Sequence, residues 1–230
     1  MADRPFRIVE VIYPGMTQLD FTAPHTVFSR IPKSETIVAS LAGGAVESDG
    51  GLTFAGTTPM AAIESCDLLF FPGGFAATEV ASDPAFMGEA KRLASGARYL
   101  TSVCTGSLIL AATGLLKGRR AACHWAWRDM LGLFGAIPDP ARVVRDGDII
   151  TAGGVTSGID FALVVAAELA GEGFAQAVQL NLEYAPAPPF NSGRPETAPP
   201  EILAMVMQRM EAMMPARLAQ AKLAAAMVDG

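Results

Sequence analysis

The sequence predicts an α/β fold, a three-layer α/β/α sandwich with a mainly parallel central sheet and added β-hairpins. Short runs rich in β-branched and aromatic residues alternate with longer helical patterns, which is typical of βαβ units. Residues 66–71 are almost continuously apolar, as expected of a central strand covered on both faces. With 230 residues, 51% of them hydrophobic, the chain can bury a large core within one domain.

The order of these runs predicts the individual elements. Strands are expected over residues 6–13, 35–42, 66–74, 97–103 and 119–125. Hairpins are expected over residues 45–57 and 142–154, which alternate about Asp-Gly turns. Helices are expected over residues 83–95, 105–116, 125–134, 156–170 and 174–184. One further helix is expected to start near Asp20, after the first strand.

The composition changes after residue 184. Residues 1–184 are expected to form a single α/β domain, and residues 185–230 a proline-rich arm and a C-terminal helix packed on the domain or on a dimer partner. Six prolines between residues 185 and 200 exclude a regular helix there. Residues 201–228 have high helix propensity, and Pro215 is expected to kink or break that helix. Their methionines suggest an adaptable binding surface or, as we favour, a packing stripe.

Composition also excludes several classes of protein. The formal net charge is −6 and the basic residues are scattered, so a nucleic-acid partner is not expected. No segment has the roughly 18 uninterrupted apolar residues that a membrane span requires, and the N-terminus lacks a signal-peptide pattern. Three cysteines without CxxC spacing argue against a disulfide framework or a zinc site and favour a cytoplasmic location. Nucleotide-binding glycine motifs are absent, so no cofactor and no metal is expected.

Cys104 falls between the strand 97–103 and the helix 105–116, at the sheet edge where open α/β proteins bind ligands. A residue at this junction turns sharply and points out of the sheet, as in a nucleophile elbow. The helix start would stabilise a thiolate and lower the thiol pKa, and Thr105 offers a hydroxyl and an amide beside the sulfur. Cysteine is also a common core residue, so the local sequence leaves both roles open.

Several other residues also carry two interpretations. Cys66 lies at the far end of its strand and is expected to be inert, and Cys123 is expected to be a core residue. Asp20 fits a helix N-cap, which the local sequence favours, or an acidic partner of the cysteine. Gly73 and Gly74 allow either a close backbone approach to a ligand or a simple tight turn.

Residues near two further sheet-edge segments are candidates for the pocket wall. Val155 opens the helix 156–170 at the edge where Cys104 lies and is expected to line the pocket. His124, from the predicted strand 119–125, fits a pocket position or a structural histidine equally well. His25, on the first helix, is expected at either the pocket rim or a subunit interface.

Five blocks of sequence carry a resemblance to a known superfamily. They are "YPGMTQLDFTAPHTVF", "LLFFPGGFA", "SVCTGSLILAATGLLKGRRAACHW", "GGVTSGIDFAL" and "LEYAPAPPFNSGRPETAP". In this order they resemble the ThiJ/PfpI superfamily, which has a flavodoxin-like, class I glutamine-amidotransferase-like sandwich with a cysteine on the elbow. The resemblance covers about residues 6–200, and within the superfamily it is closest to the isonitrile hydratases.

This resemblance implies an activity and roles for particular residues. It implies hydration of a small-molecule isonitrile to an N-substituted formamide by a homodimer, through a cysteine thioimidate, without a cofactor. Cys104 would be the nucleophile and Asp20 the acid/base, with Thr105 beside them. Protease-like members carry a histidine directly after the nucleophile, so Thr105 argues against a Cys-His peptidase dyad.

Two other functions remain open for a chain with this resemblance. One is glyoxalase or deglycase-type thiol chemistry on 2-oxoaldehydes. The other is a non-catalytic ligand or redox sensor, since an elbow thiolate is readily oxidised. Similar domains form the sensing half of AraC-type regulators, but only about 30 residues follow the arm, too few for the DNA-binding half.

Overall fold

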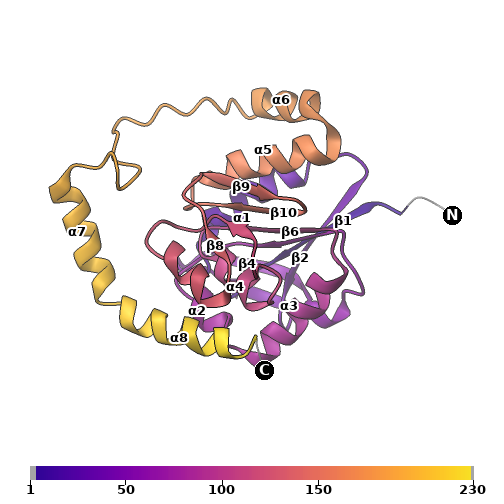
Figure 1. Cartoon of the computed structure of the whole chain (residues 1–230). Helices are drawn as coiled ribbons and strands as arrows, with labels where there is room; N and C mark the ends of the chain where they lie inside the picture. Colours follow the sequence, from indigo (N-terminus) through magenta and orange to yellow (C-terminus); the bar gives the residue numbers. More distant parts are fainter. Residues whose placement is uncertain (1–3, 229–230) are drawn as a thin grey trace.

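The computed structural model describes residues 4–228, so the ends of the two predicted units, residues 1–3 and 229–230, lie outside the described part. An eight-stranded sheet crosses the molecule in the order β3-β4-β2-β1-β5-β6-β10-β9. Helices cover both faces of this sheet (Figure 1). The predicted three-layer α/β/α sandwich is therefore confirmed.

The strands follow the sequence pattern closely at the centre of the sheet. Four strands run parallel there: β1 (Phe6–Val11), β2 (Ser34–Ser40), β5 (Leu68–Phe71) and β6 (Tyr99–Val103). Both predicted hairpins are present: β3 (Gly44–Glu47) with β4 (Thr53–Pro59), and β9 (Val143–Asp146) with β10 (Ile149–Ala152). In each hairpin one strand joins the sheet in parallel, so the two remaining strands form antiparallel edges.

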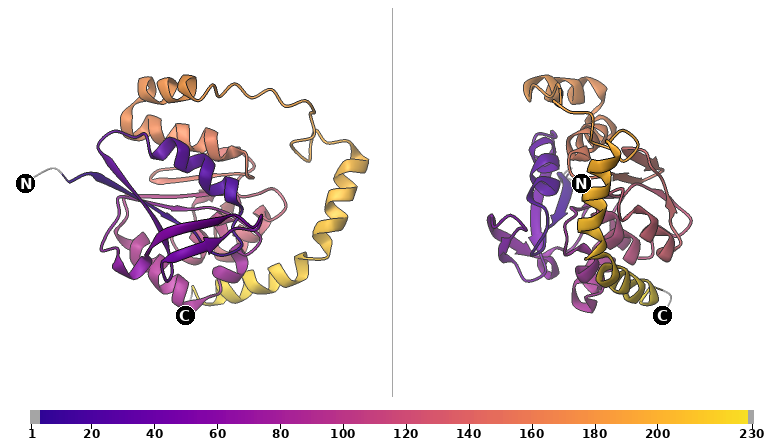
Figure 2. Two further views of the ribbon diagram at one scale, coloured as in Figure 1. Left: turned by 180° about the vertical axis from the view of Figure 1, so that it is seen from behind. Right: turned by 90° about the vertical axis from the view of Figure 1, so that its left-hand side faces the viewer.

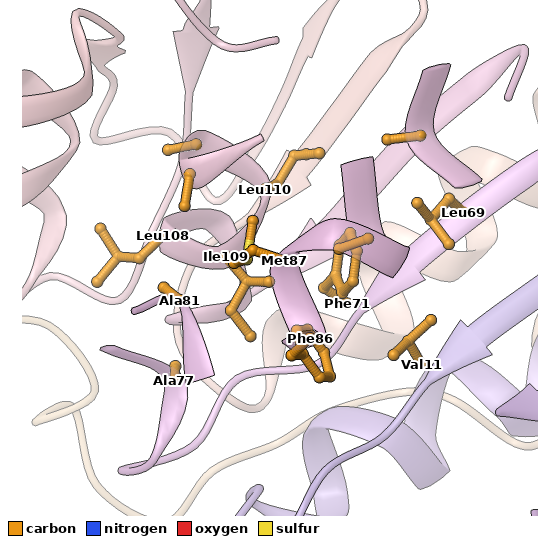
Figure 3. Packing of buried hydrophobic residues seen from close by; sticks show 14 of the residues in the cluster. Val11, Leu69, Phe71, Ala77, Ala81, Phe86, Met87, Leu108, Ile109 and Leu110 are labelled. Carbon is orange, nitrogen blue, oxygen red and sulfur yellow. The ribbon is translucent and has the colours of Figure 1, made fainter. Parts of the chain in front are cut away.

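The helices bury two separate apolar clusters, one on each face of the sheet. One face carries α1 (Gln18–Phe28), α5 (Ser157–Ala170) and α6 (Glu172–Asn181). The other carries α2 (Ala77–Val80), α3 (Pro84–Gly96), α4 (Gly106–Ala112) and the short 3-10 helix η1 (Met60–Ala62). Figure 3 shows Phe86 and Met87 of α3 and Ile109 of α4 facing Phe71 of the central strand β5.

The predicted strand over residues 119–125 is wrong for most of its length. Only β7 (Arg120–Ala121) forms, and it pairs with β8 (Ile137–Pro138) in a separate two-stranded sheet. The position beside β6 is taken by β10, so this segment has no ladder partner in the main sheet. Cys123 and His124 consequently lie outside any strand.

Three predicted helices differ from the structure in type or length. The helix over 125–134 is the 3-10 helix η2 (Arg128–Phe134) instead. The helix over 105–116 ends early, at Ala112, before Gly114 adopts a φ of 87°. The helix over 174–184 begins two residues earlier and ends at Asn181. The short helix α2 was not predicted.

The C-terminal part leaves the sheet and returns to it. Residues 184–199 form no regular helix or strand, and they lead into α7 (Pro200–Glu211) and α8 (Met214–Ala226). Figure 2 shows this arc leaving α6 at one end of the molecule and returning at the other. The predicted break is confirmed, because Pro215 occupies the first turn of α8, where a missing amide costs nothing. Ala221 and Ala224 of α8 are buried, whereas α7 buries no residue.

No helix formed by residues 4–228 is long and apolar enough to cross a membrane.

Candidate active site

Cys104 occupies the sharp turn between β6 and α4. Its φ is 58°, a left-handed conformation that a residue with a β-carbon adopts only at a cost of order 1 kcal/mol or more. The Cys104 amide donates to two carbonyl oxygens at the end of β10, Ala152 at 3.0 Å and Gly153 at 2.8 Å. These bonds hold the turn in place, so the elbow that the sequence predicts is present.

Two close contacts fix the start of α4 against the end of β5. A β-carbon on Gly106 would lie 2.2 Å from the Phe71 carbonyl oxygen, so only glycine fits this contact. The Thr105 hydroxyl accepts from the Gly74 amide and donates to the Gly74 carbonyl, both at 2.9 Å. Thr105 thus ties the elbow to the loop after β5, and its hydroxyl is already fully engaged by the backbone.

Asp20 reaches the elbow from α1, where it is fully buried. Thr17 occupies the N-cap position and makes no side-chain cap bond, so the N-cap interpretation of Asp20 is wrong. A β-carbon on Gly73 would lie 2.7 Å from Asp20 Oδ2, 2.7 Å from Cys104 Cβ and 2.6 Å from the Thr105 nitrogen. Because Gly73 has no side chain, the Asp20 carboxyl group and Cys104 can both pack against it.

The carboxyl and the thiol both hold their protons more tightly than usual. Burial raises the pKa of Asp20 to about 7, although the nearby Cys104 thiol and Gly73 amide oppose the shift. No hydrogen bond of normal geometry reaches either Asp20 oxygen from the described residues. Burial, and then the charge of Asp20, raise the pKa of Cys104 well above its usual value, against the Thr105 amide. The expectation that the helix start lowers this pKa is wrong, because burial outweighs it.

A cavity of about 230 Å³ opens beside Cys104. Its wall is mostly apolar and joins residues from distant parts of the chain. The lining residues are Thr17, Asp49, Gly74, Phe75, Cys104, Thr105, His124, Trp127, Val155 and Met210. The structure therefore brings the candidates Gly74, Val155 and His124 to the same cavity as Cys104.

His124 is a neutral member of the cavity wall. Burial lowers its pKa to about 4, and its Nδ1 accepts from the Ala126 amide at 3.3 Å. Its ring packs against Trp125 and Trp127. A neutral, stacked imidazole suits positioning and shape better than proton transfer near neutral pH.

The sequence alone did not point to five of the lining residues: Thr17, Asp49, Phe75, Trp127 and Met210. Phe75 directly follows the Gly73-Gly74 pair and is half exposed, which was the one local signal available. Met210 belongs to the methionine-rich C-terminal segment and reaches the cavity from the end of α7. Nothing in the sequence indicates that this segment folds back over the elbow.

The other cysteines and His25 stay away from this cavity. Burial raises the pKa of Cys66 to about 11 and that of Cys123 to about 12, and neither lines the cavity with Cys104. His25 does not reach the cavity rim and instead pairs with Glu10 at 2.5 Å. Among residues 4–228, no three histidine, cysteine or acidic side chains group as metal ligands do.

Comparison with known proteins shows which proteins this chain is similar to. A family model described as the DJ-1/PfpI family matches residues 6–168. An isonitrile hydratase from Pseudomonas putida is 46% identical over 193 residues, 84% of this chain and 85% of the relative. A deglycase from Pyrococcus abyssi is 28% identical over 154 residues, 64% of this chain and 82% of that relative.

Solved structures show the same relationship. The crystal structure of a THiJ/PfpI family protein from Pseudomonas syringae overlays with a TM-score of 0.90 and 38% identity, covering 96% of this chain and 90% of that one. This overlay includes the C-terminal arc as well as the sandwich, since it spans nearly the whole chain. The resemblance read from the five sequence blocks is thereby confirmed, and the chain belongs to the DJ-1/PfpI family.

Proposed function

We propose that this protein is an isonitrile hydratase that adds water to an isonitrile and releases an N-substituted formamide. The observation that carries the proposal is the meeting of Asp20 and Cys104 across Gly73, beside a largely apolar cavity. A buried acid next to a nucleophile is what addition to a small, weakly polar electrophile requires. The isonitrile hydratase relative supports the same activity.

In the first step the pair acts with one proton between its two members. This proton rests on the Cys104 thiol, whose pKa lies well above that of Asp20, and it first moves to the Asp20 carboxylate. Cys104, now a thiolate, forms a C–S bond with the terminal carbon of the isonitrile, and Asp20, now a carboxylic acid, delivers the proton to that carbon. The product is a thioimidate on Cys104, with Asp20 left as carboxylate. The raised pKa of Asp20, about 7, makes its carboxylate a better acceptor of the thiol proton than an ordinary aspartate is.

In the second step the same carboxylate acts as a base. Asp20 draws a proton from water while the water oxygen bonds to the thioimidate carbon, and Asp20 then passes that proton to the nitrogen. Asp20 then takes the hydroxyl proton as the C=O bond forms, the C–S bond breaks with its electron pair on sulfur, and the formamide leaves. One water hydrogen ends on nitrogen and the other restores the proton of the Asp20–Cys104 pair, so the enzyme returns to its starting state.

The surrounding residues have supporting roles in this proposal. The Thr105 amide faces the sulfur of Cys104. The Thr105 hydroxyl holds the loop after β5 through two hydrogen bonds of 2.9 Å to the Gly74 backbone. Gly73 and Gly74 let the backbone approach the reacting atoms, while Val155 and His124 shape the cavity. None of these roles requires a metal or an organic cofactor.

We further propose a cytoplasmic homodimer. All three cysteines are free, as a reducing compartment maintains them. The arm and α7 expose Phe190, Ile202 and Met205, with Phe190 79% accessible, which a second copy would cover. Size-exclusion chromatography with light scattering tests the assembly, and a 24.0 kDa particle at micromolar concentration would contradict it.

The activity is tested with Cys104→Ala and a simple alkyl isonitrile, following formamide by mass spectrometry. Formamide production should disappear, whereas Cys66→Ala, at the far end of β5, should retain it. Unchanged turnover in Cys104→Ala would overturn the proposal. A parallel assay with methylglyoxal separates the alternative thiol chemistry, because lactate without formamide would favour the deglycase-like activity of the Pyrococcus relative.

A further inference from the structure

We propose that a second, arginine-lined cavity next to the Cys104 cavity binds a carboxylate carried by the substrate. This inference rests on the proposed function, since it names the class of isonitrile that the site takes. The substrate would then be an isonitrile with a carboxylate at its other end, and the product an N-formyl amino carboxylate.

The second cavity, of about 250 Å³, adjoins the first. The two cavities share His124 and Val155 in their walls, so these two side chains are the boundary between them. The remaining wall comes from Cys123, Trp125 and Arg128, the loop before β9, the start of α5 and residues 193–196 of the arm. In this proposal a short chain of the substrate lies between His124 and Val155, so that it joins a group over Cys104 to a group in the second cavity.

The charges differ sharply between the two cavities. The wall near Cys104 is mostly apolar, whereas the second wall holds three guanidinium groups, Arg128, Arg142 and Arg194, against one carboxylate, Glu196. Arginine presents paired N–H donors that match a carboxylate. The positive excess of the wall therefore selects an anion, and the planar forks favour a carboxylate.

Two of these arginines are already committed to the protein. Arg142 is paired with Asp160 and donates to the Thr156 carbonyl oxygen at 2.8 Å. Arg194 lies 3.4 Å from Glu196 and 3.4 Å from the Pro140 carbonyl oxygen. Both fix the shape of the cavity, and their charges are balanced by these carboxylates.

Arg128 is the arginine that is open to a ligand. It forms no hydrogen bond or ion pair with any residue in the range 4–228, although it is only partly exposed. Asp139, an acidic neighbour, is already bound by the Arg120 guanidinium at 2.5 Å and 3.0 Å. Arg128 acts on Asp139 only through its charge, and a partly desolvated arginine that makes no hydrogen bond or ion pair in a concave wall is a favourable place for an incoming carboxylate.

The start of α5 adds to this preference. Thr156 and Ser157 line the cavity at the N-terminus of a 14-residue helix, where the peptide dipoles favour negative charge. The helix start, Arg128 and the arm thus face one space from three parts of the chain. Their combination in one cavity, and not the helix alone, carries the inference.

The test compares ω-isocyano carboxylates of increasing chain length with their methyl esters. At the best length we expect kcat/KM for the acid to exceed that for the ester by about tenfold or more, because the ester lacks the charge. Arg128→Gln should bring this ratio close to one by raising KM for the acid. Arg98→Gln, an exposed arginine over the Tyr99 ring, is the matched control and should keep the wild-type ratio. Equal kcat/KM for acid and ester in the wild type, or an unchanged ratio in Arg128→Gln, would overturn the inference.

A binding measurement separates this inference from the proposed activity. Isothermal titration with an N-formyl ω-amino carboxylate should show binding that Arg128→Gln weakens about tenfold or more, with or without isonitrile turnover. If no isonitrile is hydrated but this Arg128-dependent binding is found, the proposed activity fails and the carboxylate site stands. If neutral isonitriles are hydrated and no such binding is found, the activity stands and the carboxylate site fails.

Discussion

Asp20 and Cys104 come from different helix starts and meet on the same face of Gly73. The point where a Gly73 β-carbon would stand is 2.7 Å from both Asp20 Oδ2 and Cys104 Cβ. The absence of a side chain at position 73 is therefore a condition for the acid and the nucleophile to approach each other. A single methyl group added at position 73 would therefore disturb the approach of Asp20 to Cys104.

Gly73→Ala should disable the site while leaving the sheet intact. Its φ is not in the left-handed region, so the harm comes from contacts with Asp20, Cys104 and the Thr105 amide and not from backbone strain. A displacement of the reacting groups by about 1 Å lowers turnover roughly 100-fold. We expect a loss of at least this size in kcat on an alkyl isonitrile.

Gly88→Ala is the control for this variant. Gly88 lies inside α3, its added β-carbon meets nothing within 4 Å, and alanine is the better helix former. This variant should keep full turnover and raise the free energy of unfolding by about 0.5–1 kcal/mol in urea titrations. Full activity in Gly73→Ala would show that the contact at Gly73 has no bearing on catalysis.

Asp20→Asn should separate turnover from thiol ionisation. Loss of the acid/base is expected to lower kcat by roughly 10²–10⁴-fold. At the same time the Cys104 thiol should titrate at lower pH, because the Asp20 charge is one of the causes that raise its pKa, after burial. The nucleophile thus becomes easier to ionise while turnover falls, and a general loss of structure would not produce this combination.

The thiol titration is read from the pH dependence of alkylation by iodoacetamide, with the Cys104 peptide quantified by mass spectrometry. The midpoint should move to lower pH in Asp20→Asn than in the wild type. Cys66, which is also buried and whose pKa is raised by burial and by Asp67 without a contribution from Asp20, serves as the internal reference within each sample. A midpoint that stays in place or rises would contradict the electrostatic coupling of Asp20 and Cys104.

The pH profile of the wild-type enzyme follows from the same pair. The active form holds one proton between the carboxyl and the thiol. Below the Asp20 pKa of about 7 both groups are protonated, and no thiolate can form by transfer to the carboxylate. We therefore expect kcat/KM to rise as pH increases through about 7 and then to level off, measured with a neutral isonitrile.

The direction in which kcat/KM changes near pH 7 distinguishes two possible roles of Asp20. A site that used Asp20 only as a permanent acid would lose activity as pH rises through the same value. His124 is not expected to change kcat/KM near pH 7, because burial holds its pKa at about 4. A profile that falls between pH 6 and 8 would exclude the exchange of one proton between Asp20 and Cys104.

The central strands and the elbow were predictable because their signals are local. The continuous apolar run of β5 and the strand-cysteine-helix junction at Cys104 require only neighbouring residues to recognise. The meeting of Asp20 with Cys104 came from the family resemblance, since no local pattern at Asp20 distinguishes a cap from a buried acid. The structure decides this point by placing Thr17 at the N-cap.

The failures of prediction depend on distant parts of the chain. Residues 119–125 have strand propensity, but β10 occupies the neighbouring position in the sheet, which no window of sequence reveals. Met210 joins the cavity through an arc that begins more than twenty residues earlier, at the end of α6. The raised pKa of Cys104 reflects burial by the assembled fold, which opposes the local effect of the helix start.

The Glu10–His25 pair predicts how stability depends on pH. Glu10 is fully buried in β1, and its Oε2 lies 2.5 Å from His25 Nδ1. Burial raises the pKa of Glu10, and the hydrogen bond to Glu10 raises the pKa of His25 above its ordinary 6.5. The folded protein thus holds both protons more tightly than the unfolded chain. The stability that His25 contributes is therefore complete below about pH 6.5 and is lost as pH rises through its raised folded pKa.

The double variant Glu10→Gln/His25→Gln keeps the side-chain volumes and removes both titrations. In urea unfolding between pH 6 and 8.5, the wild type should lose free energy of unfolding relative to this variant as pH increases, and parallel curves would show that the pair does not couple folding to protonation.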